Sequence, residues 1–525
     1  MLARILLGTD EKQRFHRALL LAAVLVGLGL RVFNYAVRPP SLWQDEAYWA
    51  IKAIKTQAID AQIRPLGFML VTQLLLHTFK AAAWVYRILP FAGAMVSMLL
   101  APYVALRLFR GAWTQLLSVT LLALSPVLLE MAVEFKHYGT EVGVYVGLLA
   151  ALLYHREKRT LWSFCGLLGL AWFSFFFSIT VIFFYPALFG VLLWDAWGSK
   201  QWKRLASIAA VALVCLGTIT TIYFTTWRTI KTGKAENKWG TWYDVFYVKN
   251  GLKTQYDSRL AWTTGKYFEL AAVPGVGREV WAPASSATPK LKQLKQADWA
   301  LWSVLHLAGL AFLLRKRRVF ELVALWTPLL FVTGFNLAGR WPAGAFRTNT
   351  FYAPFAILVA CFACEWVAAL PFKLRYLTPA IVALLLLPTA YFRPALTEKG
   401  LWAKPGDFTT ALRLLPLSPA KGQNTLLMDF ASCRPWDYYT VHDVPIGELG
   451  GTLRSRYKER CLRQTRKLTA EMSRVATPER GFWMLMTDPR KYDALQEVAR
   501  KYCEKVDVQF VRGTTHMVLH CNRGK

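Results

Sequence analysis

Acidic residues are scarce in this chain of 525 residues: 32 Asp and Glu stand against 63 Lys and Arg, and the formal net charge is +31. In a soluble protein this imbalance would favour binding to nucleic acid. Here 55% of the residues are hydrophobic, and the basic residues lie largely in short loops between apolar runs and in the C-terminal region. Membrane topology and anionic lipid therefore explain the charge, and we expect no nucleic-acid partner.

The sequence also contains no recognisable internal repeat, Gly/Ser-rich linker or low-complexity segment. Secondary transporters often contain repeats, so the first absence counts against a transporter. No small-residue cleavage site follows the first apolar run, which predicts a retained membrane anchor rather than a cleaved signal peptide. The expected outer loops contain no Asn-x-Ser/Thr sequon, which is compatible with a bacterial protein but does not decide the question.

Apolar runs of about 17 to 25 residues, the length that spans a bilayer as a helix, recur along the chain as far as residue 392. Placing the basic loops on the cytoplasmic side predicts a polytopic α-helical membrane protein with about 11 transmembrane helices. The expected spans are 18–37, 84–106, 113–131, 142–154, 161–177, 179–197, 205–226, 299–314, 319–337, 350–370 and 376–392. The apolar segment 64–80 is short, and we expect it to lie in the outer interface, since a crossing there would put the basic loop at 155–159 outside.

This topology divides the chain into a membrane module, 1–392, and a C-terminal region on the outer face, 393–525. The module has a first outer loop at 38–83 and a long outer loop at 228–298. The C-terminal region is predicted to form a soluble α/β domain, because its apolar runs are only as long as strands. These runs are 425–430, 482–487, 506–511 and 516–521. The last two runs flank a predicted hairpin turn, and Asp488-Pro489 predicts the start of a helix.

The eight cysteines fall into two groups of four. Those in the C-terminal region could form two disulfides in an oxidising compartment, with three possible pairings: Cys433, Cys461, Cys503 and Cys521. The other four lie in expected spans and are interpreted as core residues: Cys165, Cys215, Cys361 and Cys364.

Two adjacent carboxylates, Asp45 and Glu46, follow the first expected span, among the aromatic residues Trp43, Tyr48 and Trp49. Paired carboxylates are costly at a membrane surface and are suited to a general base, so we predict that this pair is catalytic. The alternative is a solvated loop or the first turn of a helix. Trp43 and Trp49 are candidates for acceptor or sugar binding, although aromatic residues at this depth often belong to the membrane-interface belt.

Other outer segments supply cations that could hold an anionic phosphate. The candidates for donor phosphate binding are Lys136, His137, Tyr138, Arg64, Arg340 and Arg347, and Glu141 is a further candidate for acceptor or sugar binding. Interfacial snorkelling residues or ordinary loop charges are the alternatives. A carboxylate to activate a hydroxyl and cations to stabilise a leaving phosphate form a coherent set for group transfer from a lipid phosphate.

Four stretches in order carry a family resemblance: LWQDEAYWA, RPLGFMLVTQLLLHTF, WVYRILP and LSPVLLEMAVEFKHYG. This order is similar to the GT-C membrane glycosyltransferases, and within them to the protein mannosyltransferase and lipid A aminoarabinose transferase branch. The resemblance covers residues 18–160 well and the later spans by architecture. The family often has Arg-x-Tyr where this chain has Lys136-His137-Tyr138, and lysine cannot form the two-pronged hydrogen bonds of arginine.

The resemblance implies juxtamembrane helices in the first outer loop, Asp45 as the catalytic base and Glu46 as its neighbour. It also implies a sugar donor linked to polyprenyl phosphate and one inversion at the anomeric carbon. We therefore expect a hexosyl or pentosyl transferase of cell-envelope glycan biosynthesis, with membrane lipid and an acceptor glycan, lipid or protein as its partners.

Neither a cofactor nor a metal is assigned from the sequence. A divalent metal on Asp45 and Glu46 stays open for this superfamily, although the outer loops contain no Asp-x-Asp motif. The expected location is a bacterial inner membrane, with the active site facing the periplasm or exterior. A lipid or glycan flippase and a non-catalytic anchoring protein are the alternatives. The position of the charges at span ends counts against the first.

Overall fold

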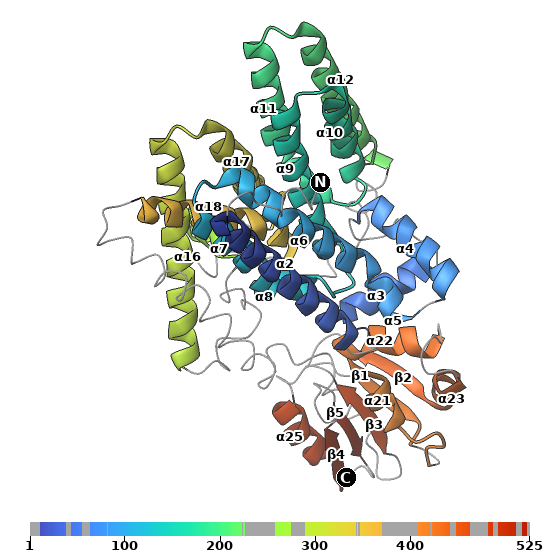
Figure 1. Ribbon diagram of the computed structural model, residues 1–525. Helices are drawn as coiled ribbons and strands as arrows, with labels where there is room; N and C mark the ends of the chain where they lie inside the picture. Colours follow the sequence, from blue (N-terminus) through green and yellow to red (C-terminus); the bar gives the residue numbers. More distant parts are fainter. Residues whose placement is uncertain are drawn as a thin grey trace. The chain divides into compact units, whose positions relative to one another are not determined.

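The computed structural model of the chain (Figure 1) describes residues 11–37, 42, 44–54, 64–80, 82–222, 224–225, 258–274, 289–342, 344, 347–369, 408–420, 423–441, 448–462, 481–486, 492–510 and 517–521. The chain divides into two compact units. Unit 1 comprises Met1–Ala36, Ile59–Leu70 and Arg87–Arg393, and unit 2 comprises Val37–Ala58, Val71–Tyr86 and Pro394–Lys525. The first outer loop is thus divided between the units, whereas the sequence analysis places it with the membrane module.

Unit 1 is helical. Its elements are α2 (Glu11–Val37), α6 (Ile88–Leu108), α7 (Ala112–Leu124), α8 (Pro126–Met131), α9 (Tyr138–Lys158), α10 (Leu161–Ser174), η1 (Ile179–Phe183), α11 (Tyr185–Gly198), α12 (Trp202–Ile222), α15 (Arg259–Ala271), α16 (Pro289–Arg315), α17 (Val319–Leu337), η6 (Arg347–Tyr352) and α18 (Ala353–Ala368). Within this unit, α6 packs along α9, and α16 packs along α18. Figure 1 shows α10, α11 and α12 as one group in green.

Each of the first ten expected spans contains a helix. Among the described residues, six helical segments are long and apolar enough to cross a membrane: Gln13–Ala36, Ile88–Leu108, Trp202–Ile222, Gln296–Arg315, Val319–Leu337 and Thr348–Ala368. The expected span 319–337 coincides with α17. The expected interfacial segment 64–80 forms the short apolar helix α4 (Leu66–Phe79). The last expected span, 376–392, lies outside the described residues.

The expected span 113–131 is broken into α7 and α8, and the cause is Pro126. Proline has no backbone N–H, so it cannot bond to the carbonyl of Leu122, four residues earlier. Arg31 of α2 supplies the missing donor, because one guanidinium nitrogen lies 3.0 Å from that carbonyl oxygen and the other 3.3 Å from the carbonyl oxygen of Ala123. Arg31 is buried, and both terminal nitrogens of its guanidinium group donate to backbone carbonyl oxygens.

The close crossing of α6 and α9 depends on glycine. A Cβ atom built on Gly143 of α9 would lie 2.5 Å from the carbonyl oxygen of Gly93 of α6, and one on Gly139 would lie 2.6 Å from that of Pro90. Such distances are too short for any side chain, so only glycine lets the two backbones approach this closely, as small residues do in membrane helix pairs. Because Gly139 follows Tyr138 directly, this crossing fixes the start of α9.

Unit 2 contains a five-stranded sheet of order β2-β1-β3-β5-β4. Its strands are β1 (Thr425–Asp429), β2 (Lys458–Leu462), β3 (Phe482–Met486), β4 (Val506–Phe510) and β5 (Met517–Cys521). The pairs β1–β2 and β1–β3 are parallel, and the pairs β3–β5 and β4–β5 are antiparallel. The expected strands are therefore all present. The edge strand β2 was not expected, because KERCL has too few apolar residues to mark a strand.

The helices of unit 2 are α3 (Gln44–Ile54), α5 (Ala83–Tyr86), α21 (Phe408–Arg413), α22 (Phe430–Val441), α23 (Glu448–Arg456) and α25 (Tyr492–Tyr502), together with most of α4. The two disulfides are Cys433–Cys461 and Cys503–Cys521, which selects one of the three possible pairings. Of the other cysteines, three are buried as expected, whereas Cys165 is exposed. The predicted start of a helix at Asp488-Pro489 lies outside the described residues.

Candidate active site

The segment 134–141 buries several ionisable side chains of unit 1 together. Glu134, Lys136, His137 and Glu141 are each at most 9% exposed, and Tyr138 is 5% exposed. Burying charges costs several kcal/mol unless they interact with partners. An ordinary interfacial loop would leave such groups in water, so their joint burial favours a functional site over the snorkelling alternative.

Glu141 lies in the first turn of α9 and is fully buried. Its Oε1 atom lies 3.6 Å from Nε2 of His137 and accepts a hydrogen bond from the backbone N–H of Thr180 at 3.4 Å. Thr180 belongs to η1, where its hydroxyl lies 3.1 Å from that of Ser178 and its carbonyl accepts a hydrogen bond from Tyr145. The carboxylate is thus held between α9 and η1 in a polar cluster, and Ser178 and Thr180 of this cluster were not predicted as site residues.

Arg64 lies just before α4 and is 5% exposed, in unit 1. The segment that carries it meets the segment 134–141 through aromatic rings, because Phe68 stacks on Phe135 with ring centroids 5.9 Å apart. The backbone N–H of Phe68 also donates to the carbonyl of Phe176 at 3.2 Å. The structure therefore brings the Arg64 and Lys136 segments side by side, and the role of these two residues in phosphate binding stays a prediction.

The loop from Gly339 to Asn349, which carries Arg340 and Arg347, is held by a chain of hydrogen bonds. Trp262 of α15 donates to Asn336 at 2.8 Å, and Asn336 donates to the carbonyl of Trp341 at 2.8 Å. The ring N–H of Trp341 donates to Asn349 at 2.8 Å, and Asn349 donates to two loop carbonyls at 3.0 Å. Asn349 is fully buried, so its bonds shape the loop without exchange with water.

Lys266 and Glu269 of α15 form an ion pair beneath the same loop. The Lys266 Nζ atom lies 2.8 Å from Oε1 of Glu269, and the lysine side chain is 3% exposed. A Cβ atom on Gly344 would lie 2.1 Å from Oε2 of Glu269, and Gly344 has a φ of +98°. Glycine is therefore required where the loop passes over this carboxylate. This pair could not be predicted from the sequence, because a lone Lys-x-x-Glu spacing is common on helices.

Arg340 and Arg347 differ in their placement. Arg340 is exposed, with its backbone N–H bonded to the carbonyl of Phe335 at 2.8 Å. Arg347 is the first residue of η6, which packs against α8 and α9, and its side chain lies outside the described residues. Tyr145 of α9 contacts Phe351 of η6, with ring centroids 4.7 Å apart. The loop that carries the predicted arginines thus adjoins the helix that begins at the segment 134–141.

Asp45 and Glu46 belong to unit 2, where they lie in the first turn of α3. The side chain of Glu46 is fully buried, whereas the side chain of Asp45 and the whole of Trp43 lie outside the described residues. A helix N-terminus favours carboxylates, as the structural alternative expects. Trp49 is 2% exposed and packs within the unit. The catalytic role of the carboxylate pair and the sugar-binding role of the two tryptophans stay predictions.

The described part of the chain contains no group of three or more His, Cys, Asp or Glu side chains that could hold a metal ion. The metal hypothesis for Asp45 and Glu46 also stays a prediction, because the Asp45 side chain is not among the described residues.

No protein-family model and no curated protein matches the chain. The chain is similar in structure to ArnT from Cupriavidus metallidurans. The apo structure of ArnT has 14% sequence identity and a TM-score of 0.46, with 96% of this chain and 97% of ArnT covered. The structure of ArnT bound to undecaprenyl phosphate has 13% identity and a TM-score of 0.46, with 98% of each chain covered.

The apo structure of an oligosaccharyltransferase from Archaeoglobus fulgidus is also similar, with 13% identity, a TM-score of 0.44, and 94% of this chain and 73% of that chain covered. ArnT is a lipid A aminoarabinose transferase, and both proteins are GT-C glycosyltransferases, the class that residues 18–160 resemble in sequence.

Proposed function

We propose that this chain is a membrane glycosyltransferase that moves a sugar from a polyprenyl-phosphate donor to an acceptor hydroxyl at the outer membrane–water interface. The observation that carries the proposal is the joint burial of Glu134, Lys136, His137 and Glu141 in eight residues of unit 1. The described part of the chain contains six helices long and apolar enough to cross a membrane, and buried ionisable groups in an integral membrane protein mark functional sites.

The proposed reaction is a single displacement with inversion. Asp45 accepts the proton of the acceptor hydroxyl, and the hydroxyl oxygen forms a bond to the anomeric carbon of the sugar. The bond between that carbon and the phosphate oxygen breaks, and polyprenyl phosphate leaves with the electron pair. Lys136 and Arg64 would stabilise the negative charge that develops on the leaving phosphate.

Two features of the described residues support these roles. The Arg64 and Lys136 segments meet through Phe68 and Phe135, so two buried cations belong to neighbouring backbone segments. Glu141 is fixed by the N–H of Thr180 and lies near His137, which provides a buried acceptor for sugar hydroxyl groups. A water-excluding environment strengthens each of these interactions.

The test is sugar transfer by the purified protein in lipid nanodiscs from a radiolabelled polyprenyl-phosphate sugar, with Asp45→Asn beside the wild type. We expect turnover or donor hydrolysis in the wild type and at least about a hundredfold loss in the variant, as removal of a general base typically gives. Donor binding should persist in the variant, because the proposed phosphate contacts come from other residues.

The matched control is Asp195→Asn in α11, a partly exposed aspartate whose carboxylate pairs with Arg156 at 3.3 Å. This variant makes the same chemical change at a carboxylate that has no role in the proposed reaction, and it should keep wild-type turnover. Full activity in Asp45→Asn would exclude Asp45 as the base and direct attention to Glu46 or Glu141. Absence of turnover with lipid translocation by the wild-type protein in proteoliposomes would favour the flippase alternative.

A further inference from the structure

The first outer loop and the C-terminal domain share one helix contact inside unit 2. Helix α3, which carries Asp45 and Glu46, packs against α22 of the C-terminal domain. Three alanines at a spacing of three residues are among the buried side chains of α3, with Ala47 and Ala50 fully buried and Ala53 2% exposed. Small side chains let two helices approach closely, so the packing against α22 restricts where α3 can lie.

Hydrogen bonds fix the entry and the exit of α3 in the same unit. Before the helix, the backbone N–H of Leu42 donates to the hydroxyl of Tyr439 of α22 at 2.6 Å. At its end, the side-chain amide of Gln73 donates to the carbonyl of Ala53 at 3.3 Å. Next to Tyr439, Tyr438 makes an edge-on ring contact with Tyr86, with centroids 6.1 Å apart. The residues at the C-terminal end of α22 thus contact Leu42 and Tyr86, which lie 397 and 352 residues earlier in the sequence.

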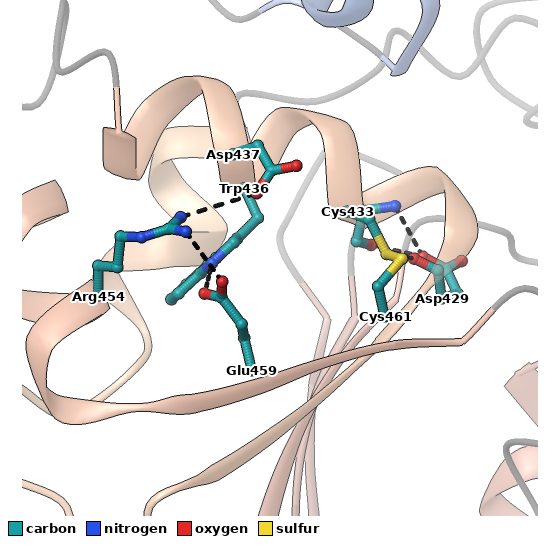
Figure 2. Close-up of a disulfide and its surroundings, with 8 residues drawn as sticks. Asp429, Cys433, Trp436, Asp437, Arg454, Glu459 and Cys461 are labelled. Carbon is teal, nitrogen blue, oxygen red and sulfur yellow. Dashed lines mark hydrogen bonds and ion pairs between the residues drawn. A yellow bond between two sulfur atoms is a disulfide. The ribbon is translucent and has the colours of Figure 1, made fainter.

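Another face of α22 is fastened to the sheet, as Figure 2 shows. Cys433 is bonded to Cys461 of β2, and the ring N–H of Trp436 donates to Glu459 of the same strand. Arg454 of α23 pairs with Glu459 at 3.1 Å and with Asp437 at 3.7 Å. Residues 433, 436 and 437 follow the three- and four-residue spacing of one helix face. The start of α22 is capped by Asp429, whose carboxylate accepts from the N–H of Ser432 at 2.9 Å.

We propose that the C-terminal domain is the positioning device of the α3 helix, with Tyr439 as a positioning residue and Cys433–Cys461 as the covalent link that fixes α22 for this purpose. The proposal rests on the function proposed above for its catalytic consequence, because α3 carries the predicted base. It makes activity dependent on an oxidised C-terminal domain. The chain of contacts runs from β2 through the disulfide to α22, and from α22 through Tyr439 to the residue before α3.

The second disulfide is a matched control within the same domain. Cys503–Cys521 joins the residue after α25 to β5, on strands distant in sheet order from β2, and it makes no bond to α22. The two disulfides span similar sequence separations, 28 and 18 residues, so their removal releases similar loop entropy in the unfolded chain. Any difference between them at α3 therefore reports location rather than general stability.

The experiment compares backbone hydrogen–deuterium exchange in the full chain in nanodiscs for Cys433→Ser/Cys461→Ser and Cys503→Ser/Cys521→Ser. We expect exchange of the α3 amides to speed up by at least about tenfold in the first variant and to stay within about twofold of wild type in the second. Equal acceleration of α3 in both variants, or none in either, would overturn the proposal.

A second pair of variants tests Tyr439 without touching a disulfide. Tyr439→Phe removes the hydroxyl that accepts from Leu42, and we expect about fivefold faster exchange at α3 from the loss of one buried hydrogen bond. The control is Tyr457→Phe, which removes a hydroxyl bonded to the carbonyl of Pro416 in the same unit. In sugar transfer, Tyr439→Phe should lower kcat and leave KM for the donor unchanged, because the proposed phosphate contacts lie on unit 1.

Failure of this proposal and failure of the proposed function give different results. If the wild type transfers sugar, and the Cys433 and Tyr439 variants match it in α3 exchange and in kcat, the positioning role is wrong and the function stands. If no donor is turned over by the wild type, but α3 exchange responds only to the Cys433 and Tyr439 variants, the positioning role stands and the function is wrong.

Discussion

The glycine contact between α6 and α9 allows a sharp test of what positions the segment 134–141. In Gly143→Ala, the new Cβ would lie 2.5 Å from the carbonyl oxygen of Gly93. Ordinary contacts begin near 3.4 Å, so the helices must separate by about 0.9 Å locally. The matched control is Gly147→Ala, one turn further along α9, where nothing lies within 4 Å of the new atom.

The two substitutions share one effect and differ in the other. Alanine favours a helix over glycine by up to about 1 kcal/mol, so both variants gain this amount. Overpacking typically costs about 1–3 kcal/mol, and only Gly143→Ala incurs it. We therefore expect Gly147→Ala to melt at or slightly above the wild-type temperature, and Gly143→Ala about 2 to 6 °C below the control.

The assay combines thermal melting in detergent with sugar transfer. A shift of about 1 Å in catalytic groups can lower turnover by about a hundredfold, so Gly143→Ala should lose far more activity than stability. Gly147→Ala should retain wild-type turnover. If the two variants melt at the same temperature and transfer sugar equally, the close crossing is not what positions the start of α9.

Three further predictions concern single side chains. Asn349→Ala removes three hydrogen bonds from a fully buried residue, at a cost of about 3 kcal/mol, and should therefore lower the affinity for the donor, measured by binding of polyprenyl phosphate. Unchanged affinity would show that this loop does not contribute to phosphate binding. Lys136→Met should raise KM for the donor by about 10- to 100-fold, because it removes a charge-assisted hydrogen bond, whereas Lys136→Arg should retain most of the donor affinity. Similar KM values for the two variants would show that the positive charge at this position does not bind the donor. Burial lowers the pKa of His520 from its usual 6.5, so the unfolded chain binds a proton first as the pH falls. The stability of the C-terminal domain should therefore decline as the pH falls below about 6.5 and level off below the pKa that His520 has in the folded protein. Melting curves at pH 7.5 and 5.0 should show this difference in the wild type and not in His520→Gln.

Hydropathy predicts the helices of unit 1 well because a bilayer demands long apolar runs, and α17 matches its expected span, 319–337, in both bounds. Hydropathy does not register breaks, since Pro126 lies within a run that stays apolar on both sides. The strand β2 escaped notice for the opposite reason: an edge strand paired on one side can remain polar.

The ionisable residues of the candidate site could be selected from the sequence, whereas its uncharged residues could not. Lys136, His137 and Glu141 stand out because ionisable residues interrupt an apolar sequence, and all three are buried. The side chains that hold the neighbouring loop, Trp262 and Asn349, carry no charge, and each finds its partners through the fold. One signal was available: Asn336 ends an otherwise apolar run, where a polar amide needs a partner.

The pairing of distant segments in unit 2 could not be derived from local patterns. Nothing near Leu42 indicates that its N–H will be bonded by a tyrosine 397 residues later. The choice among three disulfide pairings is similarly a property of the fold, because the sheet order sets which cysteines meet.

This long-range contact has a consequence for how the protein is made. Helix α3 emerges early in synthesis, but Tyr439 emerges 397 residues after Leu42. At about 5 to 20 residues per second, the helix waits about 20 to 80 s for its partner. The Cys433–Cys461 bond can form only after residue 461 has been made and has reached an oxidising compartment. The contact between α3 and α22 is therefore among the last to form in biogenesis, so a partly translated chain lacks the partner that holds the start of α3.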